Sequence, residues 1–442
     1  MSTTCTSLRA ALYVYTGAEV VLARTAAVLA LVPPAGLPPL EPAASIAAAA
    51  DVVYDEPGAP MCAIHGPWPG ARPDEDACCG ASCFRLNGIA TVAAATLTAS
   101  SFEAGYMARG QPVLLDGGDE WFAQARPVLT ELGALGRLPG AESETVCVAS
   151  CAHREFTDQR RDEMTLAAYA EELEQVDDAE MAAAAAAAEA GDAWAAFDAL
   201  PEPLPDVRYL KDFHYQEAAA RRAGWPSALY SHPPHFATDW LGAGCAAEAL
   251  PSDYSFVYVG PSGSWTPFHT DVYRSFSWSA NVSGTKLWIL VPPAAAPRLR
   301  EGIGSSNTLV YDLRAALAAD PDLPAVALVQ RSGQALFVPS GWAHQVFNLT
   351  RVASVNCNWF NHANVADIVL SLARDAVLVA AQLADLAPDL AADEWRALAE
   401  QLLLAHAGLN WATFRAILDA VIPRSLPERI ILARIRHYIH FP

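Results

Sequence analysis

Hydrophobic and small polar residues alternate with a period of two along much of the stretch 254–360. In 276–282 every second position is small and polar, and the same holds for 352–360. The polar positions are Ser277, Ser279, Asn281, Ser354, Asn356 and Asn358. Because successive side chains of a strand point to opposite faces, each run predicts a strand with one apolar and one polar face. Several such strands are typical of a barrel around a wet cavity.

Two further runs complete the predicted strand region. The run 254–259 is aromatic and β-branched and ends at the turn signal 260–263. The run 285–291 is hydrophobic except for Lys286 near its start. Since lysine is almost never buried without a partner, we expect Lys286 to face an anion.

Candidate chemistry lies between these strands. His269 and Asp271 are one residue apart, and His344 follows far downstream at the end of 337–344. Two histidines and one carboxylate in this arrangement match a facial triad for iron(II), which leaves coordination positions open for a bidentate oxoacid and O₂. A His-x-Asp pair alone arises often by chance, and its setting among predicted strands gives it weight. We therefore predict that His269, Asp271 and His344 are both the metal ligands and the catalytic centre.

Motifs around the triad resemble the JmjC family of 2-oxoglutarate- and iron(II)-dependent oxygenases. They read TPFHTD at 266–271, GTKLW at 284–288, PSGWAH at 339–344 and NWF at 358–360. The segments 253–265, 274–279 and 354–356 are most similar to the JmjC-domain-containing protein four group. The likeness covers roughly residues 95–370 with gaps. It implies an α+β chain built on a double-stranded β-helix, a jelly-roll or cupin-like barrel, with helical elements at its N-terminal and C-terminal ends.

The resemblance also implies a cosubstrate pocket. Lys286 resembles the family lysine that pairs with the distal carboxylate of 2-oxoglutarate, and Thr266 resembles the hydroxyl beside it. Other pocket positions, whose identities vary among relatives, are Ser279, Asn356 and Asn358. Tyr258 lies on the strand before the turn, where it could reach the same carboxylate or pack as a core or rim tyrosine. Both interpretations of Tyr258 stay open at this point.

Three functions are compatible with this set of residues. Enzymes of the group are known as lysyl hydroxylases of the eukaryotic translation termination factor, so the resemblance implies a protein hydroxylase that uses iron(II), 2-oxoglutarate and O₂. The first alternative is an N-methyl-lysine demethylase with the same iron site. The second is a catalytically silent cupin-like binding module. The pocket residues alone do not select lysine over arginine, asparagine or a methylated amine.

Charge and composition limit the classes of partner and the compartment that we expect for this chain. The chain of 442 residues carries a formal net charge of −21, which argues against direct binding to a nucleic-acid backbone and suits a basic protein partner. The apolar stretch 8–32 is interrupted by Arg9, Glu19 and Arg24, so we expect a docked amphipathic helix and no membrane span. Nine cysteines without regular pairing favour a reducing compartment. We expect the cytoplasm, with the nucleus as the alternative.

The chain divides into three predicted parts: an N-terminal extension at 1–90, the oxygenase domain at 91–362 and a helical region at 363–442. Alanine and acidic residues at 177–205 predict a low-complexity insertion with an exposed helix and linker. Apolar residues at three- and four-residue spacing after 365 predict helices that support the barrel or form a homodimer contact.

Several other cysteines and histidines are of a type that can bind a metal. The cysteines and histidine of 62–65 and 78–83 fit no strong metal template, so we interpret that region as an ordinary insertion. His232 and His235 flank two prolines and are interpreted as loop histidines. His437 and His440 are interpreted as part of a terminal helix face.

Overall fold

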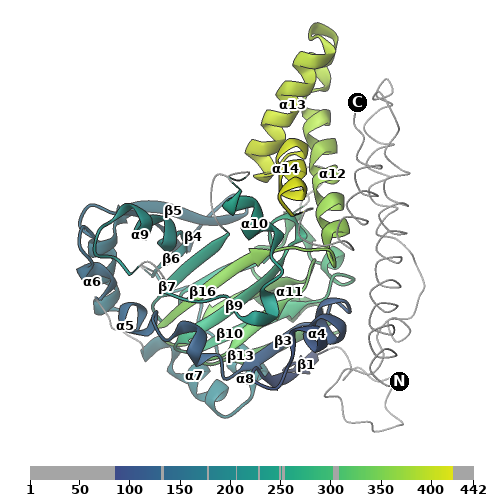
Figure 1. Cartoon of the computed structure of the whole chain (residues 1–442). Helices are drawn as coiled ribbons and strands as arrows, with labels where there is room; N and C mark the ends of the chain where they lie inside the picture. The colour runs from purple at the N-terminus through teal and green to yellow at the C-terminus, as the bar shows by residue number, and fades with distance from the viewer. Residues whose placement is uncertain are drawn as a thin grey trace, which may run out of the picture.

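The computed structural model describes residues 85–421 except 131–133, 177–178, 206, 227–228, 248–249, 251–253 and 302–307. The expectations for the stretch 8–32, for the cysteines of 62–83 and for the terminal histidines His437 and His440 lie outside these residues. Within the described part, helices surround two large β-sheets (Figure 1). The fold is a mixed α and β structure with mainly antiparallel sheets, which agrees with the α+β class that the resemblance implied.

The larger sheet has nine strands in the order β2-β3-β14-β9-β16-β7-β6-β4-β5. All of its pairs are antiparallel except β2 with β3. In sheet order the strands are β2 (Thr91–Ala93), β3 (Val113–Asp116), β14 (Ala335–Val338), β9 (Phe276–Ser283), β16 (Val352–Trp359), β7 (Ser255–Gly260), β6 (Arg208–Phe213), β4 (Thr145–Glu155) and β5 (Asp158–Thr165).

The smaller sheet has five strands in the order β1-β13-β10-β15-β8, antiparallel except for β1 with β13. Its strands are β1 (Arg85–Asn87), β13 (Ala325–Gln330), β10 (Lys286–Val291), β15 (Ala343–Asn348) and β8 (Trp265–Thr270). A separate short pair joins β11 (Arg300–Glu301) to β12 (Thr308–Leu309).

Helices cover the sheets and extend beyond them. The helices are α4 (Ala99–Phe102), α5 (Arg126–Leu129), α6 (Leu166–Gln175), α7 (Ala182–Glu189), α8 (Ala193–Asp198), α9 (Tyr215–Arg221), α10 (Trp240–Ala246), α11 (Leu313–Ala319), α12 (Val365–Gln382), α13 (Ala392–Ala407) and α14 (Trp411–Val421). Among the described residues, no helix combines the length and the apolar character that a membrane span requires.

Alternation along the strands separates an apolar core from a polar interior. In β9, Trp278 and Ala280 belong to the core on the outer face of the larger sheet. In β10, Leu287 and Ile289 belong to a different core on the outer face of the smaller sheet. In both strands, the residues that alternate with these core residues face the space between the two sheets. Trp288 of β10 packs there with other buried side chains. The polar face predicted from the sequence therefore lies in the interior between the sheets.

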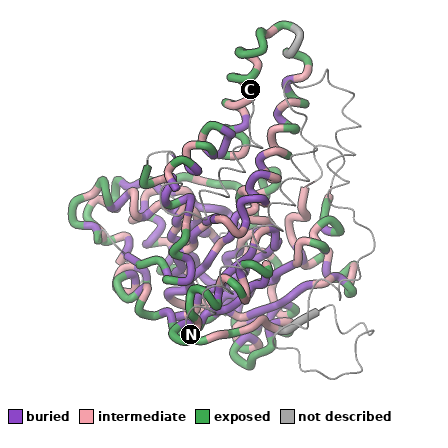
Figure 2. The backbone as a smooth tube through the Cα atoms, turned by 45° about the vertical axis from the view of Figure 1, so that its right-hand side comes forward, coloured by how far each residue is buried: buried purple, intermediate pink, exposed green. Residues whose placement is uncertain are grey.

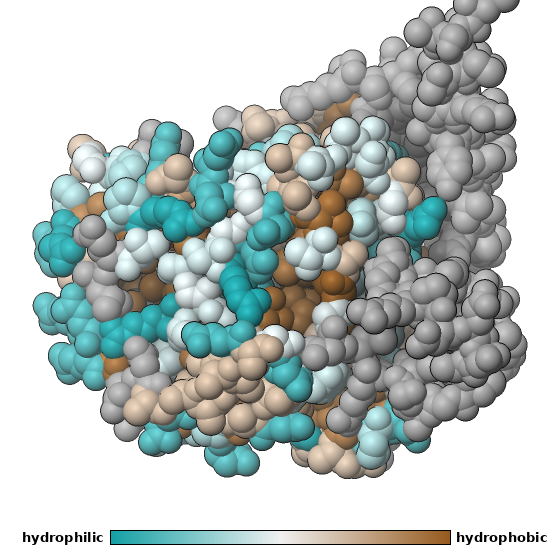
Figure 3. All heavy atoms as spheres, turned by 90° about the horizontal axis from the view of Figure 1, so that it is seen from below, coloured by the Kyte–Doolittle hydropathy of each residue, from teal (hydrophilic) through white to brown (hydrophobic). Residues whose placement is uncertain are grey.

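The insertion at 177–205 corrects one expectation. It forms the helices α7 and α8, and the side chains of Ala184, Ala188 and Ala196 are buried in the core that includes β10 and β13. The helix predicted to be exposed thus covers the smaller sheet, because its alanines are small enough for close approach. Seen from below, hydrophilic residues are interspersed with hydrophobic patches on this side of the molecule (Figure 3).

The C-terminal part of the described chain is helical, as predicted. Helices α12, α13 and α14 project from the body of the protein (Figure 1), and they share an apolar core with α10. Buried residues fill the body and line the inner side of this projection, while exposed residues follow its outer side (Figure 2). Leu378, Leu386 and Leu404 are among its exposed apolar side chains.

Candidate metal centre

The structure brings His269, Asp271 and His344 together between the two sheets. β8 delivers His269, Asp271 follows directly after that strand, and β15 delivers His344 as the register partner of His269. One ligand atom from each residue lies within 4.8 Å of the others. The two imidazole rings have centroids 4.3 Å apart. Side chains more than seventy positions apart in sequence thus form one group that can hold a metal ion.

Backbone carbonyls orient both imidazoles. Nδ1 of His269 lies 2.8 Å from the Pro267 carbonyl oxygen, and Nδ1 of His344 lies 3.3 Å from that of Trp342. Donation of the Nδ1 proton to a carbonyl leaves Nε2 unprotonated for a metal, which is the usual arrangement of histidine ligands. The pKa of His344 is lowered to about 4, chiefly by burial and also by nearby His269, while Asp271 and the Trp342 carbonyl act in the opposite direction. His344 is therefore neutral near pH 7, the form a metal requires.

Two polar side chains orient the carboxylate of Asp271. The hydroxyl of Ser277 donates to Oδ2 at 2.7 Å, and the amide of Asn358 donates to Oδ1 at 3.0 Å. Asn358 also donates to the hydroxyl of Ser275 at 3.1 Å. Asn358, predicted to contact the cosubstrate, thus contacts the candidate metal ligand. Ser277 was predicted only to lie on a polar face, and the alternation in β9 was the signal for its position.

Lys286 is buried on the interior side of β10. Its ammonium group donates to the hydroxyl of Ser354 at 2.7 Å and lies 5.9 and 6.0 Å from the ring centroids of Tyr258 and Trp288. Burial lowers the pKa of Lys286 to about 7. A buried ammonium with a neutral hydroxyl partner is suited to an anionic ligand, because the anion would restore the charged form.

The hydroxyl of Tyr258 has a protein partner. It donates to Oδ1 of Asp212, whose other oxygen forms an ion pair of 2.7 Å with Arg161. Burial and the adjacent carboxylate raise the pKa of Tyr258 well above its usual value, so the hydroxyl stays protonated. The structure thus connects the ring of Tyr258 to Lys286 and its hydroxyl to Asp212.

The other predicted pocket residues lie on the same interior faces. Ser279 of β9 donates to the side-chain oxygen of Asn356 of β16 at 2.7 Å, across a register pair of the sheet. Thr266 is half-buried on β8 and is the register partner of Val346 on β15. Asn281 donates to the Gly284 carbonyl oxygen at 2.7 Å, so it supports the turn before β10.

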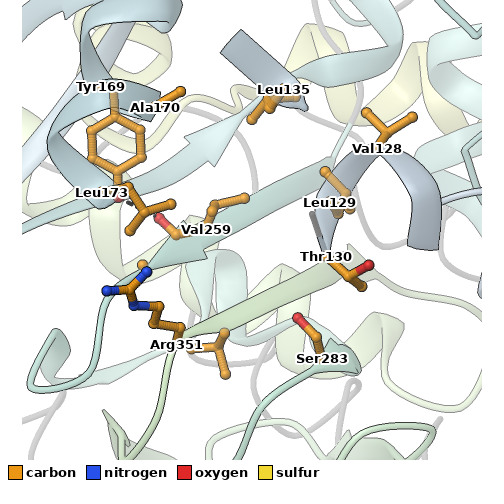
Figure 4. Close-up of a pocket in the computed structure, with 12 residues that line it drawn as sticks. Val128, Leu129, Thr130, Leu135, Tyr169, Ala170, Leu173, Val259, Ser283 and Arg351 are labelled. Carbon is orange, nitrogen blue, oxygen red and sulfur yellow. Dashed lines mark hydrogen bonds between the residues drawn. The ribbon is translucent and has the colours of Figure 1, made fainter. Parts of the chain in front are cut away.

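A separate hollow of about 190 Å³ lies on the outer face of the larger sheet (Figure 4). Its walls are mostly apolar, and Val128, Leu173 and Val259 are among the side chains that line it. The Tyr169 hydroxyl donates to the Val259 carbonyl oxygen at 2.6 Å, and the guanidinium of Arg351 donates to the Val176 carbonyl oxygen at 2.6 Å. Both polar side chains are thus engaged with the backbone, and the hollow offers no evident chemistry.

Comparison with known proteins gives a family match over the site. Residues 256–359 match the family model described as "JmjC domain, hydroxylase". This segment begins in β7 and ends at the last residue of β16, so it includes all three candidate metal ligands and Lys286.

Similar proteins occur in animals and plants. The "2-oxoglutarate and iron-dependent oxygenase JMJD4 homolog" of Drosophila melanogaster is 35% identical over 229 residues, which cover 52% of this chain and 51% of that protein. The Gallus gallus "2-oxoglutarate and iron-dependent oxygenase JMJD4" is 36% identical over 221 residues, covering 48% and 49%. The "Arginine-specific demethylase JMJ20" of Arabidopsis thaliana is 31% identical over 343 residues, covering 72% and 66%. The chain thus spans about half the length of the first two relatives.

Proposed function

We propose, from the premise that this chain is a JmjC-domain protein, that it is an iron(II)- and 2-oxoglutarate-dependent oxygenase which hydroxylates a protein side chain. The observation that carries the proposal is the convergence of His269, Asp271 and His344 in an interior that also holds the buried Lys286. We also assign the two sheets to a double-stranded β-helix, residues 91–362 to the oxygenase domain and residues 363–442 to a helical appendage.

The donor set fits the metal and the cosubstrate. Two imidazoles and one carboxylate suit iron(II) and leave positions for a chelating oxoacid and O₂. Lys286 would pair with the distal carboxylate of 2-oxoglutarate, and the Thr266 hydroxyl would assist it. When bound, the iron and the cosubstrate supply the oxidation of a substrate C–H bond. The protein residues supply position: Ser277 and Asn358 hold Asp271, and backbone carbonyls hold the histidines.

We place the substrate in the translation termination factor, with a lysine side chain as the hydroxylated residue. The support is the similarity of the segments 253–265, 274–279 and 354–356 to the JmjC-domain-containing protein four group. A formal net charge of −21 suits a basic protein segment and disfavours a nucleic acid. The cytoplasm, or alternatively the nucleus, is where such a substrate would be met, and the C-terminal helices are our candidate homodimer contact.

The test is a product assay with intact protein. Purified chain is incubated with iron(II), 2-oxoglutarate, O₂ and peptides that tile the termination factor, and mass spectrometry follows the peptides while succinate is measured in parallel. We expect one oxygen atom to be added to a lysine, and we expect this product to be lost in His344→Ala. Succinate formation without any modified peptide would rule out the termination factor as the substrate but would still support the oxygenase activity.

A second candidate function is removal of N-methyl groups from a basic side chain. The observation in its favour is the relative named as an arginine-specific demethylase, which matches 72% of this chain. Methyl-arginine and methyl-lysine peptides in the same assay separate the two, since demethylation lowers the peptide mass and hydroxylation raises it. A protein that binds manganese(II) but forms no succinate would instead be a catalytically silent binding module.

A further inference from the structure

A second group of potential metal ligands lies on the opposite face of β16. One ligand atom each from His232, Asp239 and Cys357 lies within 4.8 Å of the others. These residues come from the segment before η6 (Pro234–Phe236), from the residue that precedes α10, and from β16. The segment 232–239 and the distant strand β16 thus converge on one point.

The two groups are separated by the strand β16 itself. Cys357 is buried in the core on the outer face of the larger sheet, together with Trp278 and Trp359. Asn358, the next residue, points to the inner face, where it donates to Asp271. Because neighbouring residues of a strand point to opposite faces, a cation at Cys357 would lie behind the candidate iron site and apart from it.

The donor set suits a soft divalent ion. An imidazole nitrogen, a thiolate sulfur and a carboxylate oxygen are the ligands of zinc sites, and the thiolate and carboxylate together balance a charge of two. Around a tetrahedral zinc these atoms lie about 3.3–3.7 Å apart, so a pair at the 4.8 Å limit must close by up to about 1.5 Å. His232 is exposed, and rotation of its side chain can provide this movement.

The carboxylate of Asp239 is held in place at the start of α10. Its carboxylate accepts a hydrogen bond from the Gly242 N–H at 3.0 Å as the N-cap of α10. A bound divalent ion would stabilise the ionised form of this carboxylate.

We propose that His232, Asp239 and Cys357 form a structural zinc-type site, separate from the iron site, with a water as fourth ligand. The ion would fasten the segment 232–239 and the start of α10 to β16, directly behind the residue that orients Asp271. Zinc binding would displace the thiol proton of Cys357 and involve no redox step. This site would therefore have a positioning role and would not touch the cosubstrate.

The test uses cobalt(II) as a spectroscopic substitute for zinc in the full chain after chelation. Cobalt bound to a thiolate gives a near-ultraviolet charge-transfer band, whereas a site of two histidines and one aspartate has no thiolate. The variants are His232→Ala, Asp239→Asn, which keeps an N-cap side chain, and the matched control His153→Ala, an exposed histidine of β4. His344→Ala removes the candidate iron site and provides the converse control.

We expect the difference spectrum between wild type and His232→Ala to contain the thiolate band, and cobalt affinity at that site to fall at least about tenfold in His232→Ala and Asp239→Asn. His344→Ala should lose one equivalent of metal and keep the band. Subtraction of the variant spectrum removes any contribution from other cysteines of the chain. A difference spectrum without a thiolate band, or equal binding by wild type and His232→Ala, overturns the proposal and leaves the iron site unaffected.

Discussion

The side-chain amide of Asn358 donates a hydrogen bond to Oδ1 of Asp271 at 3.0 Å. Asn358 lies near the end of β16, and Asp271 directly follows β8. Outer contacts of this kind fix the orientation of a metal-binding carboxylate. We therefore predict that Asn358→Ala weakens manganese(II) binding by about 10- to 100-fold, measured by titration calorimetry.

The matched control for Asn358 is Asn281→Ala. Asn281 is also an interior amide, but it donates to the Gly284 carbonyl and not to Asp271. Its manganese(II) affinity should change by less than about threefold. Equal losses in the two variants would mean that a general effect on the barrel, and not the Asp271 contact, weakens the site.

Lys286→Met should separate stability from cosubstrate binding. The substitution removes a buried ammonium whose pKa is lowered to about 7, so the free energy of unfolding without ligand should rise, by roughly 2 kcal/mol near neutral pH. Affinity for 2-oxoglutarate should fall at least about a hundredfold, because the distal carboxylate loses its partner. Urea unfolding and calorimetric titration check the two parts. A less stable variant with unchanged affinity would contradict the assigned role.

The pH dependence of 2-oxoglutarate binding follows from the same lysine. The unbound folded protein loses this proton near pH 7, whereas the bound dicarboxylate requires the ammonium form, so binding takes up a proton above pH 7. Affinity should fall up to about tenfold per pH unit above that value. Calorimetry in buffers of different ionisation enthalpy measures the uptake, and its absence at pH 8 would contradict the prediction.

Stability without ligand should change with pH in the opposite sense. The pKa of Lys286 is about 7 in the folded protein and that of an ordinary lysine is 10.5, so between these values the unfolded chain binds the extra proton. The contribution of this group to the free energy of unfolding therefore rises with pH through that window. Comparison of wild type with Lys286→Met by urea unfolding at pH 6.5 and 9 isolates it, and parallel pH profiles would refute it.

Tyr258→Phe tests whether the tyrosine hydroxyl contacts the cosubstrate. In the structure it donates to Asp212, so its removal should lower the free energy of unfolding by about 1–3 kcal/mol through the carboxylate left without that donor. The affinity for 2-oxoglutarate should stay within about threefold of wild type, measured by calorimetry. A large loss of affinity with unchanged stability would show that the hydroxyl turns to the ligand on binding.

The packing of α7 can be tested with adjacent alanines. Ala184 is fully buried against the smaller sheet, while Ala183 is exposed. Ala184→Glu should destabilise the fold by about 3 kcal/mol because it buries a carboxylate, and Ala183→Glu should change stability by less than about 0.5 kcal/mol. Thermal and urea unfolding compare the two, and equal stability would contradict the assigned face.

The period of the sequence predicted the strands and the side of each strand that faces the interior. His269 and Asp271 were identifiable because their spacing is local, and His344 because its surrounding motif is specific. Partners within the interior were not predictable. Whether Asn358 contacts a cosubstrate or Asp271, and whether Tyr258 reaches Asp212, depends on twist and register between strands that no single strand encodes.

The prediction of an exposed helix in the segment 177–205 was wrong for a different physical reason. Alanine carries too little side chain to mark a buried face by periodicity, so α7 has the composition of a solvated helix. Its burial is determined by the surface of the smaller sheet onto which it folds. The same limitation applies to His232 and Asp239, whose proximity to Cys357 arises only when their segment crosses β16.

The alternation in β16 has a consequence for changes in the length of this strand. In each neighbouring pair of residues in this strand, one side chain packs in the apolar core and the other faces the polar interior between the sheets. Insertion of one residue directly after Ser354 would turn Cys357 and Trp359 inward and Asn356 and Asn358 outward, which would disrupt both the core and the polar interior. We therefore expect this strand to tolerate insertions and deletions far less well than substitution of any one of its residues.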